Sequence, residues 1–349
     1  MAQDKIRIEN LYKIFGDDPQ SVLPLVKEGI SKQELMEKHA HVLGLNNINI
    51  TVPERQISVI MGLSGSGKST LIRHINRLIE PTSGEVYVDG DDVLQMSKKQ
   101  LKEFRRNKAS MVFQRFGLLV HNTVAENVAY GLRIKGVSKT DAEEKGRHWI
   151  QRVGLEGFED HYPVQLSGGM QQRVGLARAL ATDADILLMD EAFSALDPLI
   201  RYDMQSILLE LQEELHKTIV FITHDLDEAL RIGDKVAILR DGEMVQQGSA
   251  QNIILHPADC YILDFVKDIN RARVLNLKAV MDDGVKCDGP VMPYSTLLED
   301  ALQEVMQTPE HAVNVVGRNQ EHLGTATLQS IVKAVARPEI SAEQQQAYY

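Results

Sequence analysis

Apolar and polar residues alternate in short segments near the beginning of the chain, which is the pattern of half-buried β-strands. Segments of this kind cover residues 6–15, 48–52 and 86–88. The dipeptide Asp89-Gly90 follows the last of them and is typical of a tight hairpin turn. Residues 17–46 interrupt the alternation, and the spacing of Ser31 and Glu34 predicts the first turn of a helix within this insertion. These features indicate an antiparallel sheet that carries a helical insertion.

Uninterrupted apolar runs farther along the chain predict strands that are buried on both faces. They cover residues 56–61, 186–189, 218–223 and 235–239. Helical stretches alternate with these runs; Thr140 and Glu143 repeat the capping-box spacing ahead of one that extends to Val153. Asp241-Gly242 marks a second hairpin. The alternation predicts an α/β fold with a parallel sheet, to which the hairpins add antiparallel strands.

The pattern changes after residue 275. Residues 276–337 predict one strand, a helix over 297–306, two further strands and a helix over 328–335. The last residues, 338–349, are polar and rich in glutamine, and we expect them to fray. The sequence therefore predicts a first domain over residues 1–275, a small α+β module and a polar tail.

Composition narrows the functional classes. The chain has 349 residues and a net charge of −11, so we do not expect it to bind nucleic acid, which requires a surplus of Lys and Arg on one face. Its two cysteines, Cys260 and Cys287, lack a CxxC partner and suit a reducing compartment. No apolar run approaches the roughly 20 residues of a membrane span, and the first residues do not form a secretory signal. We expect a soluble, cytoplasmic chain that reaches a membrane only through a partner.

The segment from Gly62 to Ser69, GLSGSGKS, fits the phosphate-binding pattern G-x-x-x-x-G-K-[ST] between a predicted strand and a predicted helix. Its glycines allow backbone N–H groups to turn toward phosphate oxygens, and the helix beginning near Lys68 directs its positive end at the same anion. Lys68 can reach the β- and γ-phosphates, and Ser69 can bind Mg²⁺. The sequence therefore predicts an ATP site with Mg²⁺ as cofactor. The residues expected to form it are Gly62, Ser64, Gly65, Ser66, Gly67, Lys68, Ser69 and Thr70.

Polar residues at the ends of other predicted strands are candidates for the chemistry. Asp190 suits Mg²⁺, and Glu191, one residue later, can polarise an attacking water. His224 is a candidate donor to the γ-phosphate, and Gln114 is a candidate ligand of Mg²⁺ or water. Each has a structural alternative: a solvated strand end for the acidic pair, a loop or core residue for His224, and a surface residue for Gln114.

Residues 166–173, LSGGMQQR, by themselves predict only a loop that runs into a helix. Their position matters: they follow the phosphate-binding loop and Gln114, and they precede Asp190-Glu191, the segment 194–197 and His224. This order resembles the nucleotide-binding subunit of an ABC transporter. The resemblance implies an ABC-type P-loop ATPase domain with a mixed, largely parallel core sheet. It also implies an N-terminal antiparallel β subdomain and a helical subdomain over about residues 115–180.

Roles follow from this resemblance. Gln114 matches the Q-loop, which contributes to metal binding and catalysis, and Asp190 matches the metal-binding aspartate. Glu191 matches the catalytic base and His224 the switch histidine.

The family fold further implies that one phosphate-binding loop is an incomplete site. Two copies are implied to pack head to tail, so that residues of one close over the ATP of the other. Those residues are Ser167, Gly168, Gly169, Gln171 and Asp197. The aromatic residue that stacks on adenine corresponds to Phe15, with Tyr12 as a near alternative.

A closer resemblance is to the ATPase subunits of osmoprotectant importers. It rests on the insertion, on residues 113–128 and on the C-terminal module, which is similar to a single CBS module. It implies an ATPase that energises uptake of glycine betaine, proline betaine or a related quaternary amine. It also implies a peripheral position on the cytoplasmic face of the membrane, an integral permease, and a periplasmic or lipid-anchored binding protein that selects the solute.

Two questions stay open at this point. The CBS-like module is either an appendage that stabilises a dimer or a regulatory sensor. The alternative function is that of a soluble ABC-type ATPase that clamps nucleic acid or ribosomes, against which the negative charge weighs.

Overall fold

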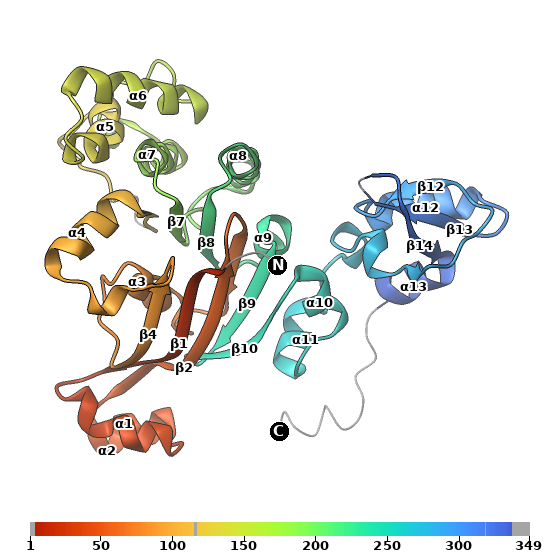
Figure 1. Ribbon diagram of the computed structural model, residues 1–349, viewed down its shortest axis with the longest axis horizontal. Helices are drawn as coiled ribbons and strands as arrows, with labels where there is room; N and C mark the ends of the chain where they lie inside the picture. The colour runs from red at the N-terminus through yellow and green to blue at the C-terminus, as the bar shows by residue number, and fades with distance from the viewer. Residues whose placement is uncertain (1–3, 115–116, 318, 337–349) are drawn as a thin grey trace. The chain divides into compact units, whose positions relative to one another are not determined.

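The computed structural model describes residues 4–114, 117–317 and 319–336 (Figure 1). The chain divides into two compact units, the first of which ends at Val245. The predicted boundary after residue 275 therefore lies inside the second unit. Within these ranges the structure contains no candidate membrane-spanning helix.

The first unit begins with an antiparallel sheet in the order β2-β1-β4-β5. Its strands are β1 (Asp4–Phe15), β2 (Val42–Pro53), β4 (Ser83–Val88) and β5 (Asp91–Asp92). The predicted turn Asp89-Gly90 joins β4 to β5, and its φ angles of 53° and 84° are those of a type I′ hairpin. Alternate residues of β1, such as Ile6 and Ile8, are buried, as the hydrophobic pattern predicts.

Two helices, α1 (Pro19–Lys27) and α2 (Lys32–His39), form the insertion between β1 and β2. Ser31 caps α2 by accepting a hydrogen bond from the Glu34 N–H at 3.1 Å, as its spacing predicts. The insertion is shorter than predicted, because residues 42–46 lie in β2 and pair with β1. Apolar residues of both helices pack against these two strands in a small cluster of Tyr12, Ile14, Val22, Val26, Leu35 and Leu43.

A six-stranded sheet in the order β10-β9-β3-β8-β7-β6 forms the centre of the first unit. Its strands are β3 (Ile57–Met61), β6 (Ala109–Val112), β7 (Ile186–Asp190), β8 (Thr218–Thr223), β9 (Lys235–Arg240) and β10 (Glu243–Gly248). The five strands from β9 to β6 run parallel, and β3, β7 and β8 are buried along their whole length. The predicted α/β class is therefore confirmed. The predicted turn Asp241-Gly242 connects β9 to β10.

Helices connect these strands. They are α3 (Lys68–Ile75), α4 (Lys98–Asn107), α5 (Val124–Ile134), α6 (Lys139–Arg152), α7 (Gly168–Ala181), α8 (Pro198–Leu215) and α9 (Leu226–Ile232). Helices α5, α6 and α7 pack on one another within the range predicted for a helical subdomain, of which residues 115 and 116 lie outside the described part. Helix α6 begins two residues earlier than predicted. Its N-cap is Ser138, which accepts from the Asp141 N–H, so Thr140 lies inside the first turn and forms no capping box with Glu143.

The second unit contains a four-stranded sheet in the order β11-β14-β13-β12. Its elements are α10 (Ala250–Leu255), α11 (Cys260–Val266), β11 (Asp282–Asp283), β12 (Val291–Pro293), α12 (Leu298–Gln307), β13 (Ala312–Val316), β14 (His322–Thr327) and α13 (Leu328–Val335). The predicted succession of strand, helix, two strands and helix is present, with the short β11 in addition. The buried Arg271 donates to the carbonyl oxygens of Ile254 and Ala334, which is why residues before 276 belong to this unit. The predicted tail, residues 338–349, lies outside the described part.

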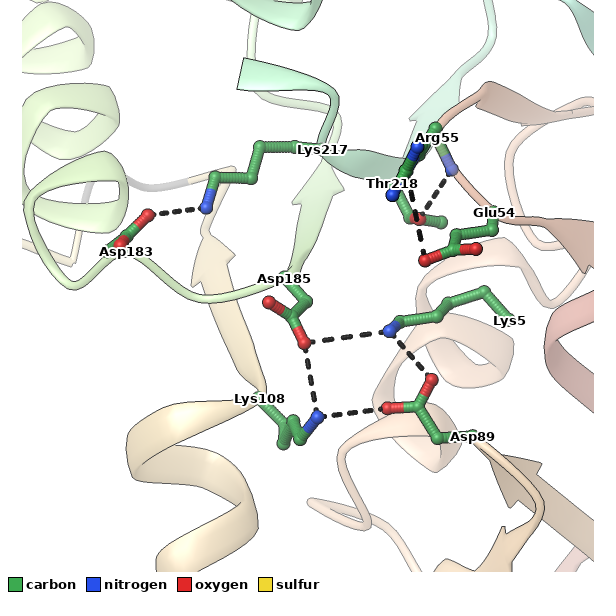
Figure 2. Close-up of polar contacts among 9 residues, drawn as sticks. All are labelled: Lys5, Glu54, Arg55, Asp89, Lys108, Asp183, Asp185, Lys217 and Thr218. Atoms are coloured by element: carbon green, nitrogen blue, oxygen red, sulfur yellow. Dashed lines mark hydrogen bonds and ion pairs between the residues drawn. The ribbon is translucent and has the colours of Figure 1, made fainter.

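A ring of four charged side chains joins segments of the first unit that are far apart in the sequence (Figure 2). Lys5 Nζ lies 2.6 Å from Asp89 Oδ1 and 3.5 Å from Asp185 Oδ2. Lys108 Nζ lies 3.2 Å from an oxygen of each acid. Burial raises the pKa of Asp185, but hydrogen bonds and charge from Lys108 and Lys5 outweigh burial and lower it. Lys108 directly precedes β6 and Asp185 directly precedes β7, so the ring ties the beginnings of both strands to β1 and the β4–β5 turn.

Removal of Lys5 should destabilise the first unit, because the Lys5 side chain is only 9% exposed and its loss leaves two acids to share Lys108. We expect Lys5→Met to lower the free energy of unfolding by about 1–3 kcal/mol in a urea titration. Lys99→Met, at an exposed position on α4, should change it by no more than about 0.5 kcal/mol. Equal effects of the two variants would show that the ring contributes no stability.

Candidate active site

The loop from Gly62 to Gly67 connects β3 to α3 and passes very close to neighbouring backbone. Gly65 and Gly67 have φ angles of 83° and 100°, which favour glycine. A Cβ on Gly62 would lie 2.2 Å from the carbonyl oxygen of Leu239 in β9, and one on Gly67 would lie 2.7 Å from that of Gly44 in β2. Glycine is therefore required at both ends of the loop.

Lys68 begins α3, and its side chain is only 4% exposed. Its ammonium donates to the carbonyl oxygens of Gly62 at 2.9 Å and Leu63 at 3.0 Å, and it lies 3.6 Å from Glu191 Oε1. Burial lowers the pKa of Lys68, while the charges of Glu191 and Asp190 oppose that shift. A largely desolvated cation at the mouth of a glycine loop attracts an anion strongly.

Asp190 is the last residue of β7 and is fully buried. Its Oδ1 accepts a hydrogen bond of 2.6 Å from Ser69 Oγ, and its Oδ2 accepts one of 3.0 Å from Arg73. The sequence analysis did not predict a role for Arg73. Its spacing of four residues from Ser69 on α3 could have indicated one, because that spacing places both side chains on one helix face.

The donors beside Asp190 fit Mg²⁺. A hydroxyl and a carboxylate supply the hard oxygen ligands that this ion prefers. Over the residues that the structure describes, no group of three or more His, Cys, Asp or Glu could form a metal cage. One hydroxyl and one carboxylate suit an ion that takes its remaining ligands from phosphate and water, as Mg²⁺ does in phosphate-binding sites.

Glu191, Gln114 and His224 meet at the carboxyl-terminal edge of the parallel sheet. Gln114 Nε2 donates to Glu191 Oε2 at 2.8 Å, and His224 Nδ1 lies 3.7 Å from the same oxygen. The Glu191 N–H donates to the carbonyl oxygen of Ile222 in β8, and its φ of 46° is in the left-handed region that non-glycine residues rarely adopt. This backbone turns Glu191 toward both partners.

The other predicted loop residues surround the same place. Ser64 is exposed on the loop, whereas Ser66 is buried and its carbonyl oxygen accepts from the Gly242 N–H at 3.1 Å. The Thr70 carbonyl oxygen lies 2.6 Å from Nδ1 of His74, whose pKa burial lowers to about 4. His74 is therefore neutral at pH 7 and supports the first turns of α3 from the core.

The segment predicted to act on a second nucleotide lines a different cleft. Ser167 caps α7 by accepting from the Met170 N–H, and Asp197 caps α8 by accepting from the Ile200 N–H. A cleft of about 510 Å³ lies between these two helix starts. Its walls include Ser167, Gly168, Gly169, Leu196, Asp197 and Ile200, and no residue of the phosphate-binding loop. Gln171 does not line it; its side chain donates to the carbonyl oxygen of Leu166.

The two aromatic candidates for adenine stacking differ in exposure. Tyr12 is 9% exposed and packs in the cluster under the insertion helices, whereas Phe15 is 41% exposed. A Cβ on Gly44 would lie 2.7 Å from the Phe15 ring, and Gly44 also adjoins Gly67 of the phosphate-binding loop. The Phe15 ring is thus the one that lies open beside the loop.

Comparisons with known proteins identify the family. The model of the ABC transporter family matches residues 45–194. The glycine betaine/carnitine transport ATP-binding protein GbuA of Listeria monocytogenes is 49% identical over 95% of this chain and 82% of its own. The chain belongs to the ABC transporter family. It is an ABC-type ATPase, as its resemblance predicts.

Two further comparisons agree with this assignment. The glycine betaine transport ATP-binding protein OpuAA of Bacillus subtilis is 53% identical over 79% of this ABC ATPase and 66% of its own chain. Among solved structures, the dimeric structure of the bacterial ABC transporter cassette MJ0796 is 34% identical with a TM-score of 0.61. It covers 70% of this chain and 98% of that one, so the match is to an ATPase cassette as a whole.

Phe15→Ala should weaken ATP binding by about 5- to 150-fold, because base–aromatic stacking contributes about 1–3 kcal/mol. Phe15→Tyr should restore the affinity, because it keeps an aromatic ring. Tyr12→Leu, which removes the other candidate ring, should leave the affinity unchanged, since Tyr12 is buried under the insertion helices. Titration of each full-length variant with a fluorescent ATP analogue measures the affinity. A loss in Tyr12→Leu with none in Phe15→Ala would assign the stacking to Tyr12.

Proposed function

We propose that this ABC ATPase energises the import of glycine betaine or a related quaternary amine. The observation that carries the proposal is twofold: Ser69, Asp190, Glu191, Gln114 and His224 converge around one buried lysine, and the match to GbuA extends over nearly the whole chain. Both GbuA and OpuAA are transport proteins by name, and glycine betaine is common to the two. These matches lend no support to the nucleic-acid clamp.

In this proposal the loop and Lys68 bind the phosphates of ATP. Ser69 and Asp190 would hold Mg²⁺, and the Gln114 side chain, which donates to Glu191, would contact the ion or the attacking water. When bound, Mg²⁺ neutralises charge on the phosphate oxygens. The ATP phosphates compete with Glu191 for the Lys68 ammonium, because an anion of higher charge attracts this buried cation more strongly.

Glu191 acts as the general base. Its carboxylate stands at the edge of the sheet, one residue beyond the metal-binding Asp190, where a water in line with the γ-phosphate is within reach. The Gln114 amide donates to one of its oxygens and His224 lies near the same oxygen. These neighbours orient the carboxylate, and His224 donates to the γ-phosphate.

The separation of the phosphate-binding loop from the Ser167–Asp197 cleft favours a head-to-tail dimer. The phosphate-binding loop supplies contacts to one side of a nucleotide, whereas Ser167, Gly168, Gly169 and Asp197 line a cleft that the loop does not enter. The N-terminus of α7 lines that cleft, and the positive end of a helix dipole suits the γ-phosphate of a nucleotide held by a second copy. Gln171 supports the Leu166–Ser167 segment by donating a hydrogen bond to the Leu166 carbonyl oxygen. The MJ0796 cassette was solved as a dimer.

A groove of about 280 Å³ is the proposed docking place for an integral permease. It lies between α4, β6, α5 and α7, and its walls include Arg105, Met111, Phe113, Tyr130 and Ile134. Tyr130 and Ile134 are 41% and 45% exposed, and Phe113 directly precedes Gln114. A helix end with apolar and acidic residues would fit this groove, and its movement would reach the active site through Phe113 and Gln114.

The remaining assignments follow from the importer proposal. The chain would lie on the cytoplasmic face of the membrane as a peripheral subunit. A periplasmic or lipid-anchored binding protein would select the solute. The part of the second unit from residue 276 would serve as the CBS-like module, either as a dimer-stabilising appendage or as a sensor.

Replacement of the base tests the catalytic assignment. Glu191→Gln should hydrolyse ATP at least ~10²-fold more slowly, bind it normally and accumulate as a dimer, because closure persists when cleavage fails. Lys68→Ala should instead lose ATP affinity and remain monomeric. Turnover and light scattering in Mg-ATP measure both effects. Wild-type turnover in Glu191→Gln would remove this residue from the role.

Replacement of Ile134 tests the permease groove. Ile134→Arg should abolish co-purification with the permease from detergent-solubilised membranes, because a charge would be buried in an apolar contact. Its affinity for ATP should stay within about twofold of wild type, since the groove does not include the phosphate-binding loop. Met36→Arg, at an exposed apolar residue on α2, is the matched control and should retain the complex. Loss of the permease from both variants, or from neither, would contradict this docking place.

A further inference from the structure

Arg201, in the first turn of α8, binds two segments. One follows His224 of the candidate active site, and the other lines the Ser167–Asp197 cleft. Its Nη1 donates to Asp225 Oδ2 at 2.8 Å, and its Nη2 donates to the Leu196 carbonyl oxygen at 3.1 Å. Asp225 directly follows His224, whereas Leu196 directly precedes Asp197. One guanidinium therefore joins the residue after the switch histidine to the loop that lines the Ser167–Asp197 cleft.

Both ends of this contact are fixed within their own elements. Asp225 caps α9: its Oδ1 accepts from the Glu228 N–H at 3.2 Å, which leaves Oδ2 for Arg201. Leu196 is buried, and a Cβ on Gly169 would lie 3.7 Å from it and 3.0 Å from Ile200, the neighbour of Arg201. A shift of the His224 segment is therefore transmitted to residues that touch Gly169 of the cleft.

The guanidinium suits this task because it is planar and its two arms have a fixed angle. If one segment moves without the other, one of the two hydrogen bonds must break. Both hydrogen bonds are kept only when the Asp225 and Leu196 segments move together. A contact that served only to pack α8 on α9 would need no arm to Leu196.

We propose that Arg201 and Asp225 are positioning residues that couple the two ATP sites of the dimer. The inference rests on the proposed head-to-tail dimer, in which His224 of one copy faces its own nucleotide while its Ser167–Asp197 cleft closes on the nucleotide of the other. ATP bound at one site contacts His224, and the position of His224 then determines the position of the cleft residues at the second site. The two sites close and hydrolyse together.

Two conservative variants isolate this coupling. Asp225→Asn keeps one oxygen for the α9 cap but loses the charged partner of Arg201. Arg201→Lys keeps the positive charge but cannot reach both partners. In both, we expect ATP affinity within about twofold of wild type, kcat lowered about 10- to 100-fold by misplacement of the site residues, and a Hill coefficient for hydrolysis that falls to about one.

Arg231→Ala is the matched control. Arg231 on α9 also binds α8, through Tyr202 O, Gln205 Oε1 and Ser206 Oγ, but it touches neither Asp225 nor Leu196. Its removal should leave the Hill coefficient unchanged and kcat within about twofold. A readout of cooperativity separates the roles, because loss of packing alone does not make two sites independent. Thermal unfolding of every full-length variant verifies that it is folded. If Asp225→Asn does not fold, Arg201→Lys alone tests the coupling.

The outcomes are distinct. Loss of cooperativity in Arg201→Lys and Asp225→Asn, with retention in Arg231→Ala, supports the coupling. A wild-type Hill coefficient in both variants overturns it, and so does an equal loss in Arg231→Ala, while the dimer stands in either case. A wild-type chain that hydrolyses ATP without cooperativity and never dimerises overturns the proposed dimer, and the coupling with it.

Discussion

Three neighbouring parallel strands that end at the same edge of the sheet determine the geometry of this ATPase. β6, β7 and β8 are hydrogen-bonded neighbours, and candidate active-site residues stand at or just beyond the end of each. Gln114 follows β6, Asp190 ends β7 and His224 follows β8. Because the register of a buried sheet is fixed by its hydrophobic side chains and backbone hydrogen bonds, Gln114 and His224, which are about a hundred positions apart in the sequence, arrive 2.8 and 3.7 Å from the same oxygen of Glu191. At the opposite edge, the ring of Lys5, Asp89, Lys108 and Asp185 ties the beginnings of β6 and β7 to the antiparallel sheet.

Most of this edge could be predicted from the sequence, because strand ends and a glycine loop leave strong local patterns. The apolar runs predicted β3, β7, β8 and β9. The polar residues that follow such runs are candidates for catalysis, because they lie at the carboxyl-terminal edge of the sheet. The order of motifs then identified the family. Arg73 escaped notice, since a single arginine in a helix has no pattern of its own. Its importance comes from the buried Asp190, which lies more than a hundred residues away.

Boundaries were predicted less well, for physical reasons that differ from place to place. Thr140 and Glu143 have capping-box spacing, but Ser138 reaches the free N–H groups first, so α6 starts earlier. The insertion ends early because residues 42–46 complete the ladder with β1. The domain boundary moves back from residue 275 because Arg271 binds carbonyl oxygens within the second unit, a long-range contact that local composition does not reveal. The choice between Tyr12 and Phe15 depended on where the insertion helices pack, which again is tertiary information.

In the proposed dimer, each ATP lies between the phosphate-binding loop of one copy and the Ser167–Asp197 cleft of another. Chemical cross-linking can detect this arrangement in a chain that carries Ser64→Cys, Ser167→Cys and Glu191→Gln and in which Cys260 and Cys287 are replaced by serine. Both engineered positions are exposed. With Mg-ATP and a short bifunctional thiol reagent, we expect a covalent dimer whose linked peptides join residue 64 of one copy to residue 167 of its partner. Cross-links that form only within single chains, or at the same yield without nucleotide, would contradict it.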